Sequence, residues 1–520
     1  MDIIFWSSLP TRFGFVQRYL GPYQLGFWLE QQGYSYQVID FIQNGPLGSM
    51  PVDELVAITE KFITPQTKVI GLSSTFFYIQ KANKVNALPD VFKEAMDIIK
   101  SKYPFIKFVL GGNKAELYTS EDTNLFDAVV VGLAEDVMLE LLKFYDNKSP
   151  EPKSRRLLQH KTKFYYADDV IDKKFDIQTS RHIWSDKDCI MQGESLPLEL
   201  SRGCIFKCKF CQYPLLGRSK YDYTRSMECV REELVYNYEK WGVTNYYLLD
   251  DTFNDTVQKV QDFYEMTKTL PFKIQYATYL RADLLHRFPE TIPWLKDSGL
   301  IGAFFGIETF HVDASKSIGK GWSSKSKEFL LWLVNTAWQN KVVVHFGMIA
   351  GIPGEPVESI LESATWLKAN DIHTWNFKSL GIAKYNGHVF ASEYAKEAEK
   401  YGFTWPDPDN IYAWYNTKTK MSYKTAIKLE KFANSMRAEH TRTHLSLEAL
   451  DSWCIMSLLT LGHNISDIVQ DGNRWSNRWI NRKILKEKGK QWLEDYKTKL
   501  NNIADSMAPR DGIEPPSRRS

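Results

Sequence analysis

The sequence predicts an α/β protein: an N-terminal, doubly wound parallel sheet, a central partial (β/α)6 barrel and a C-terminal helical region. Short apolar segments alternate with amphipathic helical segments over residues 1–150, and the same alternation returns over residues 196–400. Strands that alternate with helices need crossover connections, which build parallel sheets covered by helices. Beyond Tyr401 only helical apolar stripes continue. These observations predict the fold class.

The composition is that of a folded protein without a dominant charge. The chain has 520 residues, 43% of them apolar, and its 65 basic and 63 acidic side chains give a net charge of +2. At about 150 residues per domain, this length allows about three domains. So small a charge gives no long-range field toward nucleic acid or membranes. No apolar run approaches the ~18 residues of a membrane span, and no basic signal segment follows Met1. We expect a cytoplasmic protein with no membrane span and no nucleic-acid partner.

The first domain is defined by five apolar segments and the helical patterns between them. Strands are expected at residues 3–6, 36–41, 68–74, 105–110 and 127–131. Helices are expected at residues 23–32 and 135–145, and two further helices are expected, one that begins at residue 52 and one that ends near residue 102. Small residues end three of these strands: Ser73, Gly111, Gly112 and Gly132. Because doubly wound sheets bind ligands at the carboxyl ends of their strands, these residues are candidates to line a site. The alternative is that each glycine simply turns the chain.

The remaining chain divides by pattern. Residues 151–195 are expected to form a linker, and six further strands are expected at residues 196–200, 245–249, 274–279, 303–307, 342–349 and 374–380. Six βα units suit a partial barrel over residues 196–400, followed by a helical cap at 401–507. Residues 508–520 lack apolar periodicity and are expected to be disordered. Their Gly-Ile-Glu-Pro run resembles the conceptual translation of an antisense transfer RNA T-loop, which suggests a reading frame extended past a natural domain end.

Three of the six cysteines lie within eight residues, directly after the first barrel strand. Cys204, Cys208 and Cys211 have the spacing C-x3-C-x2-C, close enough for three thiolates to bind one iron-sulfur cluster. With three protein ligands, one iron keeps an open coordination position. The alternative is a zinc site completed by Cys189, Cys229 or a histidine, although structural zinc motifs usually bring a second pair of ligands.

This loop resembles the signature of the radical S-adenosylmethionine (SAM) superfamily, C-x3-C-x-aromatic-C. The resemblance runs from about residue 196 to residue 394, and its further blocks lie in the family's order at residues 223–226, 246–254, 279–283, 305–309 and 346–355. It implies that the three cysteines hold a catalytic [4Fe-4S] cluster whose fourth iron is chelated by SAM. One electron would then cleave SAM to methionine and a 5′-deoxyadenosyl radical.

The resemblance also implies which residues bind SAM. Phe210 would cover the adenine side, Asp250 and Asp251 would meet the ammonium group, and Arg281 and Glu308 would meet the ribose or carboxylate. The turn from Gly351 to Gly354 would lie beside the adenine. Two alternatives remain open: one of the two aspartates is a helix cap, and Arg281 forms an ordinary surface ion pair.

The first domain resembles the cobalamin-binding domain that precedes the barrel in one radical SAM subfamily. The resemblance rests on residues 21–33, 38–40, 69–73, 109–112 and 130–132. It implies that Ser73, Gly111 and Gly112 line the groove for the nucleotide tail of cobalamin. The first histidine is His160, so no earlier imidazole can ligate cobalt, and the Asp-x-His-x-x-Gly loop of methionine synthase-like proteins is missing. Some subfamily members bind cobalamin without that loop, so bound cobalamin and a retained scaffold both remain open.

The sequence thus predicts a radical SAM methyltransferase that functionalises an unactivated C–H bond with the help of cobalamin. The alternatives are a cobalamin-independent rearrangement, cyclisation or oxidation, and a non-catalytic metal- or RNA-binding module. The last would use the basic residues 472–490 with Trp475 and Trp479, a pattern that also fits an amphipathic helix. The expected partners are a small-molecule or peptide substrate and an external one-electron reductant such as flavodoxin or ferredoxin.

Overall fold

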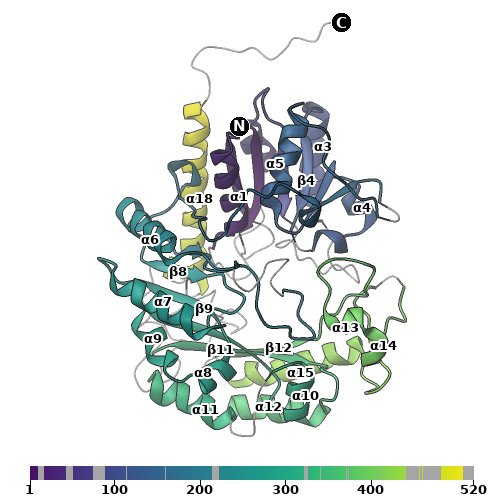
Figure 1. Ribbon diagram of the computed structural model, residues 1–520, viewed down its shortest axis with the longest axis vertical. Helices are drawn as coiled ribbons and strands as arrows, with labels where there is room; N and C mark the ends of the chain where they lie inside the picture. Colours follow the sequence, from purple (N-terminus) through teal and green to yellow (C-terminus); the bar gives the residue numbers. More distant parts are fainter. Residues whose placement is uncertain are drawn as a thin grey trace, which may run out of the picture.

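The computed structural model places two parallel sheets one above the other, with a long C-terminal helix along one side (Figure 1). It describes residues 1–9, 17–42, 51–73, 88–112, 114–157, 160–213, 222–320, 326–339, 341–370, 372, 374–408, 410–440, 456, 459–460 and 482–507. The predicted tail at 508–520, as well as Cys454, Trp475 and Trp479, lies outside these residues. No helix among them is long and apolar enough to cross a membrane.

The first sheet has the strand order β2-β1-β3-β4-β5-β6, and all neighbours are parallel. Its strands are β1 (Ile3–Leu9), β2 (Tyr36–Ile42), β3 (Val69–Ser73), β4 (Lys107–Gly111), β5 (Ala128–Val131) and β6 (Lys163–Tyr166). All four residues of β5 are buried, as expected of a strand covered on both faces. The predicted doubly wound sheet is confirmed.

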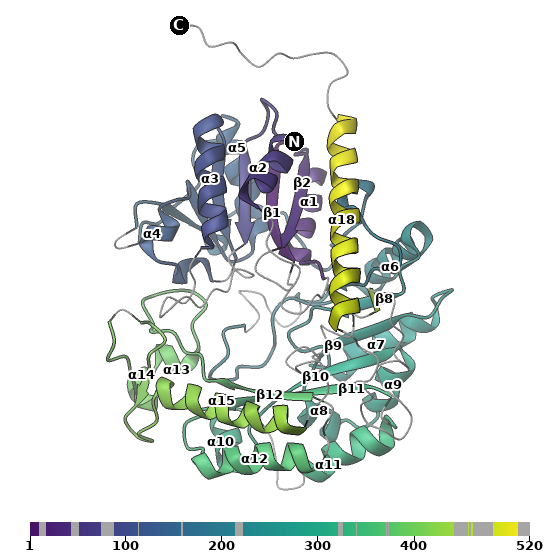
Figure 2. The same cartoon turned by 180° about the vertical axis from the view of Figure 1, so that it is seen from behind.

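Helices cover both faces of this sheet (Figure 2). Helices α1 (Leu20–Gln31) and α5 (Ala134–Tyr145) pack on one face. Helices α2 (Val52–Glu60) and α3 (Asp90–Lys102) pack on the other. Helix α1 approaches β2 closely at Gly26, where a Cβ atom would lie 2.2 Å from the ring of Tyr36. A larger residue there would push the helix off the sheet.

The second sheet is the predicted partial barrel, with strands in sequential order from β7 to β12 and every neighbour parallel. Its strands are β7 (Leu196–Leu198), β8 (Asn245–Leu248), β9 (Gln275–Leu280), β10 (Leu300–Glu308), β11 (Val343–Ala350) and β12 (Thr374–Ser379). The outer helices include α6 (Met227–Trp241), α7 (Val257–Lys268), α10 (Val312–Ser317) and α12 (Val357–Ala369). All six strands overlap the predicted positions.

Two sequence expectations need correction. Strand β6 lies inside residues 151–195, which were expected to form only a linker, because Phe164, Tyr165 and Tyr166 pair with β5 and pack against the sheet. Beyond Tyr401 the chain also forms the short antiparallel strands β13 (Phe403–Thr404) and β14 (Tyr415–Asn416). Segments of four and two residues are too short to show a period of two in the sequence.

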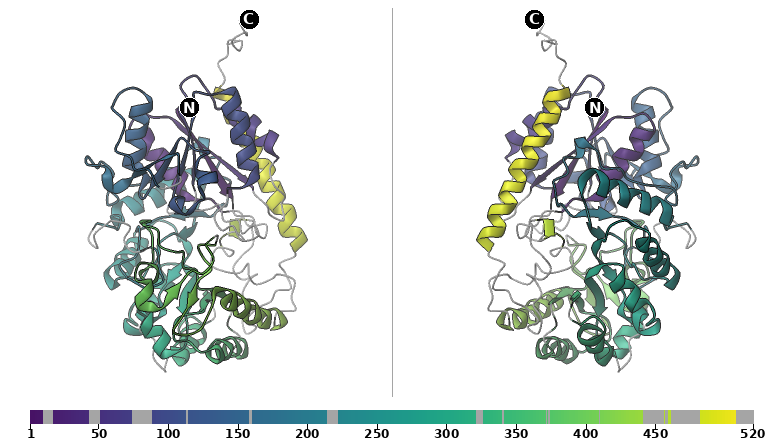
Figure 3. Two further views of the ribbon diagram at one scale, coloured as in Figure 1. Left: turned by 90° about the vertical axis from the view of Figure 1, so that its right-hand side faces the viewer. Right: turned by 90° about the vertical axis from the view of Figure 1, so that its left-hand side faces the viewer.

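The C-terminal helices do not form a single cap. Helix α15 (Tyr423–His440) packs on β12 and α12 of the barrel. Helix α18 (Arg482–Met507) instead lies along the first domain, as the side views show (Figure 3). There Trp492, Leu493 and Tyr496 join the core beneath α2 and α3. The expected helical cap is therefore divided between the two domains.

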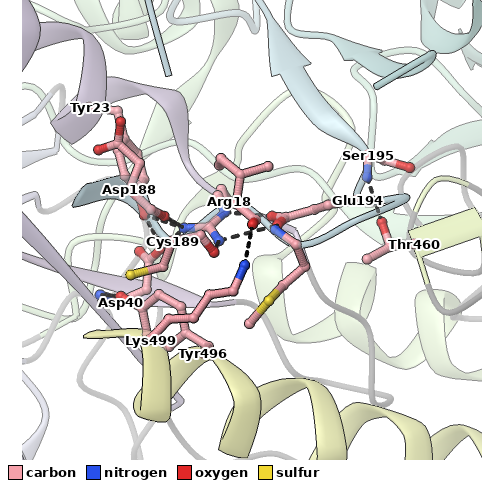
Figure 4. A network of polar contacts seen from close by, with 12 residues as sticks. Arg18, Tyr23, Asp40, Asp188, Cys189, Glu194, Ser195, Thr460, Tyr496 and Lys499 are labelled. Carbon is pink, nitrogen blue, oxygen red and sulfur yellow. Dashed lines mark hydrogen bonds and ion pairs between the residues drawn. The ribbon is translucent and has the colours of Figure 1, made fainter. Parts of the chain in front are cut away.

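Arg18 joins three distant parts of the chain (Figure 4). Its fully buried guanidinium forms ion pairs with Asp40 and Glu194. It also lies over the rings of Trp492 and Tyr496, 5.6 and 5.4 Å from their centroids. Two carboxylates and two aromatic faces compensate for the desolvation of the buried cation. Arg18 thereby holds α18 and the segment before β7 on the first domain.

Candidate functional site

The carboxyl ends of the strands in the two sheets face a common cavity of about 260 Å³. From the first sheet it is lined by Ser73, Gly111 and Gly132, and from the barrel by Glu199 and Arg202. The predicted residue Gly112 lines it as well. The structure thus brings the small strand-end residues of the first domain next to the loop that leads to the cysteines.

The cysteine loop follows β7 and is held by its own backbone. Gly203 has φ of +83°, a conformation that favours glycine, and turns the chain just before Cys204. The Cys204 N–H donates to the carbonyl of Tyr213 at 3.0 Å, and the Cys211 N–H donates to the carbonyl of Cys208 at 2.9 Å. These bonds close the loop, so its thiols are presented from one short turn.

The thiols lie in a shielded environment. Burial raises the pKa of Cys211 to about 12, and the neighbouring Cys208 and Cys204 add repulsion between thiolates. Burial also raises the pKa of Cys204, whose Sγ lies 3.4 Å from Thr252 Oγ1. Thiolates in such surroundings need a cation to neutralise them, and an iron-sulfur cluster would provide that charge.

The predicted donor set consists of the three thiols of the cysteine loop. Across the described residues, no group of three or more His, Cys, Asp or Glu side chains is arranged to hold one metal ion. In a [4Fe-4S] cluster each cysteine binds a different iron, so the sulfurs stand farther apart. The candidate fourth zinc ligands lie elsewhere: Cys189 is beside Lys187, and Cys229 Sγ is 3.7 Å from the Thr179 carbonyl.

Arg281 lies against the cysteine loop and is not an ordinary surface residue. It is 7% exposed, and its guanidinium stacks 4.0 Å from the Phe206 ring centroid. Its Nη1 lies 3.7 Å from Cys208 Sγ, while Nε and Nη2 form a two-point contact with Asp283 at 3.0 and 2.6 Å. A fixed cation beside a cysteine sulfur favours a negatively charged cluster.

The two predicted aspartates at the end of β8 have different surroundings. Asp250 is fully buried, pairs with Lys259 at 3.3 Å and accepts hydrogen bonds from Leu200 N and the Ser201 hydroxyl. Asp251 is exposed. Desolvation by the surrounding protein nevertheless raises its pKa to about 7, and repulsion from the Asp250 carboxylate adds to this rise. Asp250 therefore braces the strand end, and Asp251 is the carboxylate available to a ligand.

Glu308 stands at a distorted strand end. It has φ of +65°, and the register between β10 and β11 shifts at this point. Lys320 holds it through Oε1 at 3.0 Å and also donates to the Gly306 carbonyl at 2.6 Å. Backbone strain of this kind is concentrated at functional sites. A Cβ atom at Gly306 would lie 2.5 Å from Glu308 Oε1, so the arrangement requires glycine.

The other predicted contacts lie around the same barrel end. Phe210 is half-buried and packs against the cluster of Ile318 and Tyr394. Gly351, with φ of +99°, is packed tightly, since a Cβ atom there would lie 3.0 Å from Trp414 and from Ala426. Gly354, with φ of +86°, faces open space. Of these two glycines, only Gly354 leaves room for a ligand.

The wall of the cavity toward the first domain is mostly apolar. Side chains from the sheet and from helices α1 and α5 form it: Phe5, Trp6, Leu20, Pro22, Leu25, Leu72, Val109, Val130 and Met138. No histidine is among the described residues that line it, and His160 instead contacts Thr123 at 2.7 Å. Such a lining suits a largely apolar group.

Sequence reasoning missed the ion group at the junction of the two domains. Arg202 bonds Glu135, at the start of α5, and Glu199 at 2.7 Å, and its guanidinium lies 4.8 Å from the Phe175 ring centroid. The three charged residues are nearly buried beside the cavity. The available signal was the position of Arg202, two residues before Cys204 in a loop that must contact the first domain.

Comparison with known proteins identifies both domains by fold. The model of the radical SAM superfamily matches residues 198–367. The radical SAM methyltransferase TsrM from Kitasatospora setae, solved with tryptophan substrate and a SAM analog, is 13% identical with a TM-score of 0.56 over 97% of this chain and 99% of that chain.

A second solved structure is the cobalamin-dependent SAM radical enzyme OxsB with aqua-cobalamin and SAM bound. It is 14% identical, with a TM-score of 0.60 over 98% of this chain and 82% of that chain. No curated protein matches the sequence.

Proposed function

We propose that this chain, whose barrel residues 198–367 match the model of the radical SAM superfamily, is a cobalamin-dependent radical SAM methyltransferase. It acts on an unactivated carbon of a small-molecule substrate. Cys204, Cys208 and Cys211 hold a [4Fe-4S] cluster, and the cavity between the domains takes part of cobalamin. When bound, the cluster and SAM supply radical chemistry, and cobalamin supplies a methyl group.

The observation that carries the proposal is the shared cavity. One cavity is lined by the strand-end glycines of the first domain and by Glu199 and Arg202 of the barrel. Arg202 is separated from Cys204 by one residue. A group held by the first domain therefore lies beside the cysteine loop, which is the proximity that transfer between two cofactors requires. TsrM and OxsB, whose folds this chain shares, were solved with cobalamin bound.

The residues of this chain hold charge and exclude water. The Tyr213 N–H donates to Cys211 Sγ at 3.4 Å, and Arg281 approaches Cys208. Contacts of this kind with ligand sulfurs ease reduction of a cluster. Asp251 presents a carboxylate to the ammonium group of SAM. Glu308 and Lys320 form an ion pair that fixes the end of β10.

Anaerobic reconstitution tests the proposal. We expect about four irons per chain, 5′-deoxyadenosine from SAM and a reductant, and a corrin absorption spectrum retained after loading with cobalamin and gel filtration. Product analysis with an isotopically labelled methyl donor then identifies the methylated carbon. Cluster formation without retained corrin would contradict the cobalamin part and leave a cobalamin-independent radical reaction.

A further inference from the structure

Among the described residues that line the cavity, one polar side chain on the apolar wall has a hydrogen-bond donor without a partner. Gln24, on the first turns of α1, lines the cavity and is 4% exposed. Its Nε2 has no hydrogen-bond partner among the described residues. A buried amide N–H without a partner costs about 1–3 kcal/mol, so where such a group also lines a cavity it points to a ligand in that cavity that accepts its hydrogen bond.

The other polar side chains of the cavity are already engaged. Glu135, Glu199 and Arg202 bind one another on the barrel side, and Ser73 has its own interaction. Around Gln24 the lining is apolar, with Leu20, Leu25, Val109, Val130 and Met138 nearby on the same helices and strands. The ligand group that meets Gln24 is therefore mostly apolar and carries an acceptor atom.

The size of the cavity limits what that group is. At about 260 Å³ it is far too small for a whole corrin ring and suits a fused two-ring base. The nucleotide base of cobalamin is such a group. One of its ring nitrogens is bonded to ribose, and the other has a lone pair that is free to accept a hydrogen bond whenever the base is not bound to cobalt.

We infer that Gln24 donates a hydrogen bond to this ring nitrogen and so selects cobalamin by its nucleotide base. The inference rests on the proposed function, because it needs a corrinoid in the cavity. It adds a specificity: the enzyme distinguishes corrinoids by the base, and the residue responsible lies on α1, away from the cysteine loop. The recognised cofactor is a corrinoid whose base is detached from cobalt and carries an acceptor nitrogen.

The test compares two corrinoids and two variants in the full-length protein. Cobalamin has the base, and cobinamide lacks the whole nucleotide. Each is titrated anaerobically into the apoprotein, and the dissociation constant is measured from corrin absorption and calorimetry. For Gln24→Leu we expect about tenfold weaker binding of cobalamin, because the ring nitrogen loses its donor, and unchanged binding of cobinamide.

Gln17 provides a matched control. It is a second buried glutamine, 3% exposed, whose Nε2 also lacks a partner among the described residues, but it does not line the cavity. Gln17→Leu should leave the affinity for both corrinoids unchanged. Thermal unfolding of both apo variants verifies that the fold is retained. A phenolic corrinoid, whose base has no ring nitrogen, should bind the wild type and Gln24→Leu equally well.

The outcomes separate the two claims. If the wild type binds neither corrinoid, the cobalamin part of the proposed function is contradicted. If it binds cobalamin and Gln24→Leu weakens both corrinoids equally or neither, cobalamin binding stands and the role of Gln24 is overturned. Tighter cobalamin binding by Gln24→Leu also overturns it, since Gln24 would then only occupy space.

Discussion

The two sheets end in opposite kinds of surface, although both are parallel and both point their carboxyl ends at the same region. The first sheet ends in Ser73, Gly111, Gly112 and Gly132 around an apolar cavity. The barrel ends in thiols and charges, among them Asp251, Arg281 and the Glu308–Lys320 pair. We therefore expect the first edge to select its ligand by shape and the second edge to hold its ligands by charge and sulfur.

This difference explains how the two edges tolerate change. Gly111 at the first edge leaves space, because a Cβ atom there would meet nothing closer than the Leu72 carbonyl, so an added side chain at this position fills the site and leaves the protein folded. At the barrel edge the charged groups also brace one another, as Lys259 does for Asp250 and Asp255 at 3.3 and 2.8 Å. Substitutions there affect both folding and chemistry.

The largest effect is expected at the sulfur ligands. Cys208→Ala removes one of three cluster ligands, and we expect loss of the cluster absorption and no 5′-deoxyadenosine, because two thiolates cannot retain the cluster. Iron and sulfide analysis after anaerobic reconstitution measures this. Cys229→Ala, which removes a thiol on α6, should keep the cluster. An intact cluster in Cys208→Ala would contradict the ligand assignment.

The second largest effect is expected at Lys259, which forms ion pairs with Asp250 and Asp255 at the barrel edge. Lys259→Met leaves Asp250 and Asp255 buried without their cation, and we expect a loss of about 3–5 kcal/mol in the free energy of unfolding. Lys268→Met, on the same helix α7, removes an exposed pair with Glu265 and should cost less than about 1 kcal/mol. Urea unfolding of the apoproteins measures both. Equal losses of unfolding free energy in the two variants would show that the ion pairs of Lys259 do not stabilise this edge.

The barrel edge should also make stability depend on pH. Burial raises the pKa of Glu355 to about 8, and Thr309 donates to its Oε1 at 2.5 Å. The folded state therefore binds a proton that the unfolded state releases near pH 4.5. The contribution of Glu355 to the free energy of unfolding is therefore fully present below about pH 4.5. It falls as the pH rises from about 4.5 to about 8, by at most about 1.4 kcal/mol per pH unit.

Glu355→Gln keeps the shape of the side chain and cannot ionise. Urea unfolding between pH 5 and 8 should therefore show a flatter decline in the variant than in the wild type. Glu358→Gln, which changes an exposed carboxyl on the next turn, should keep the decline of the wild type. The same pH dependence in Glu355→Gln and wild type would contradict a protonated Glu355.

The sequence predicted the strands and the cysteine loop because their signals are local. Apolar runs of four to eight residues mark the strands, and the three thiols lie on one short loop. It did not predict the partners that distant segments supply. Asp250 and Asp251 are adjacent in sequence, and only the fold shows that Lys259 and Ser201 claim the first and leave the second exposed.

Long-range contacts explain the other differences. Strand β6 exists because β5 offers it an edge, and α18 leaves the barrel because Arg18 and the core of the first domain receive Trp492 and Tyr496. Neither partner is near in sequence, so no periodicity reveals the pairing. Gln24 likewise reads as one more residue of an amphipathic helix until the cavity beside it is known.

The smallest expected effect tests selection by shape at the first edge. Gly111→Val places a side chain at the mouth of the cavity, where a Cβ atom would meet nothing closer than the Leu72 carbonyl at 3.9 Å. Valine suits a strand, so we expect unfolding within about 1 kcal/mol of the wild type. The affinity for cobalamin should fall about tenfold because the added methyl groups narrow the entrance. Spectroscopic titration measures the affinity, and the cluster should assemble as in the wild type. Unchanged affinity would show that the glycine edge only turns the chain, and that selection by shape is not its function.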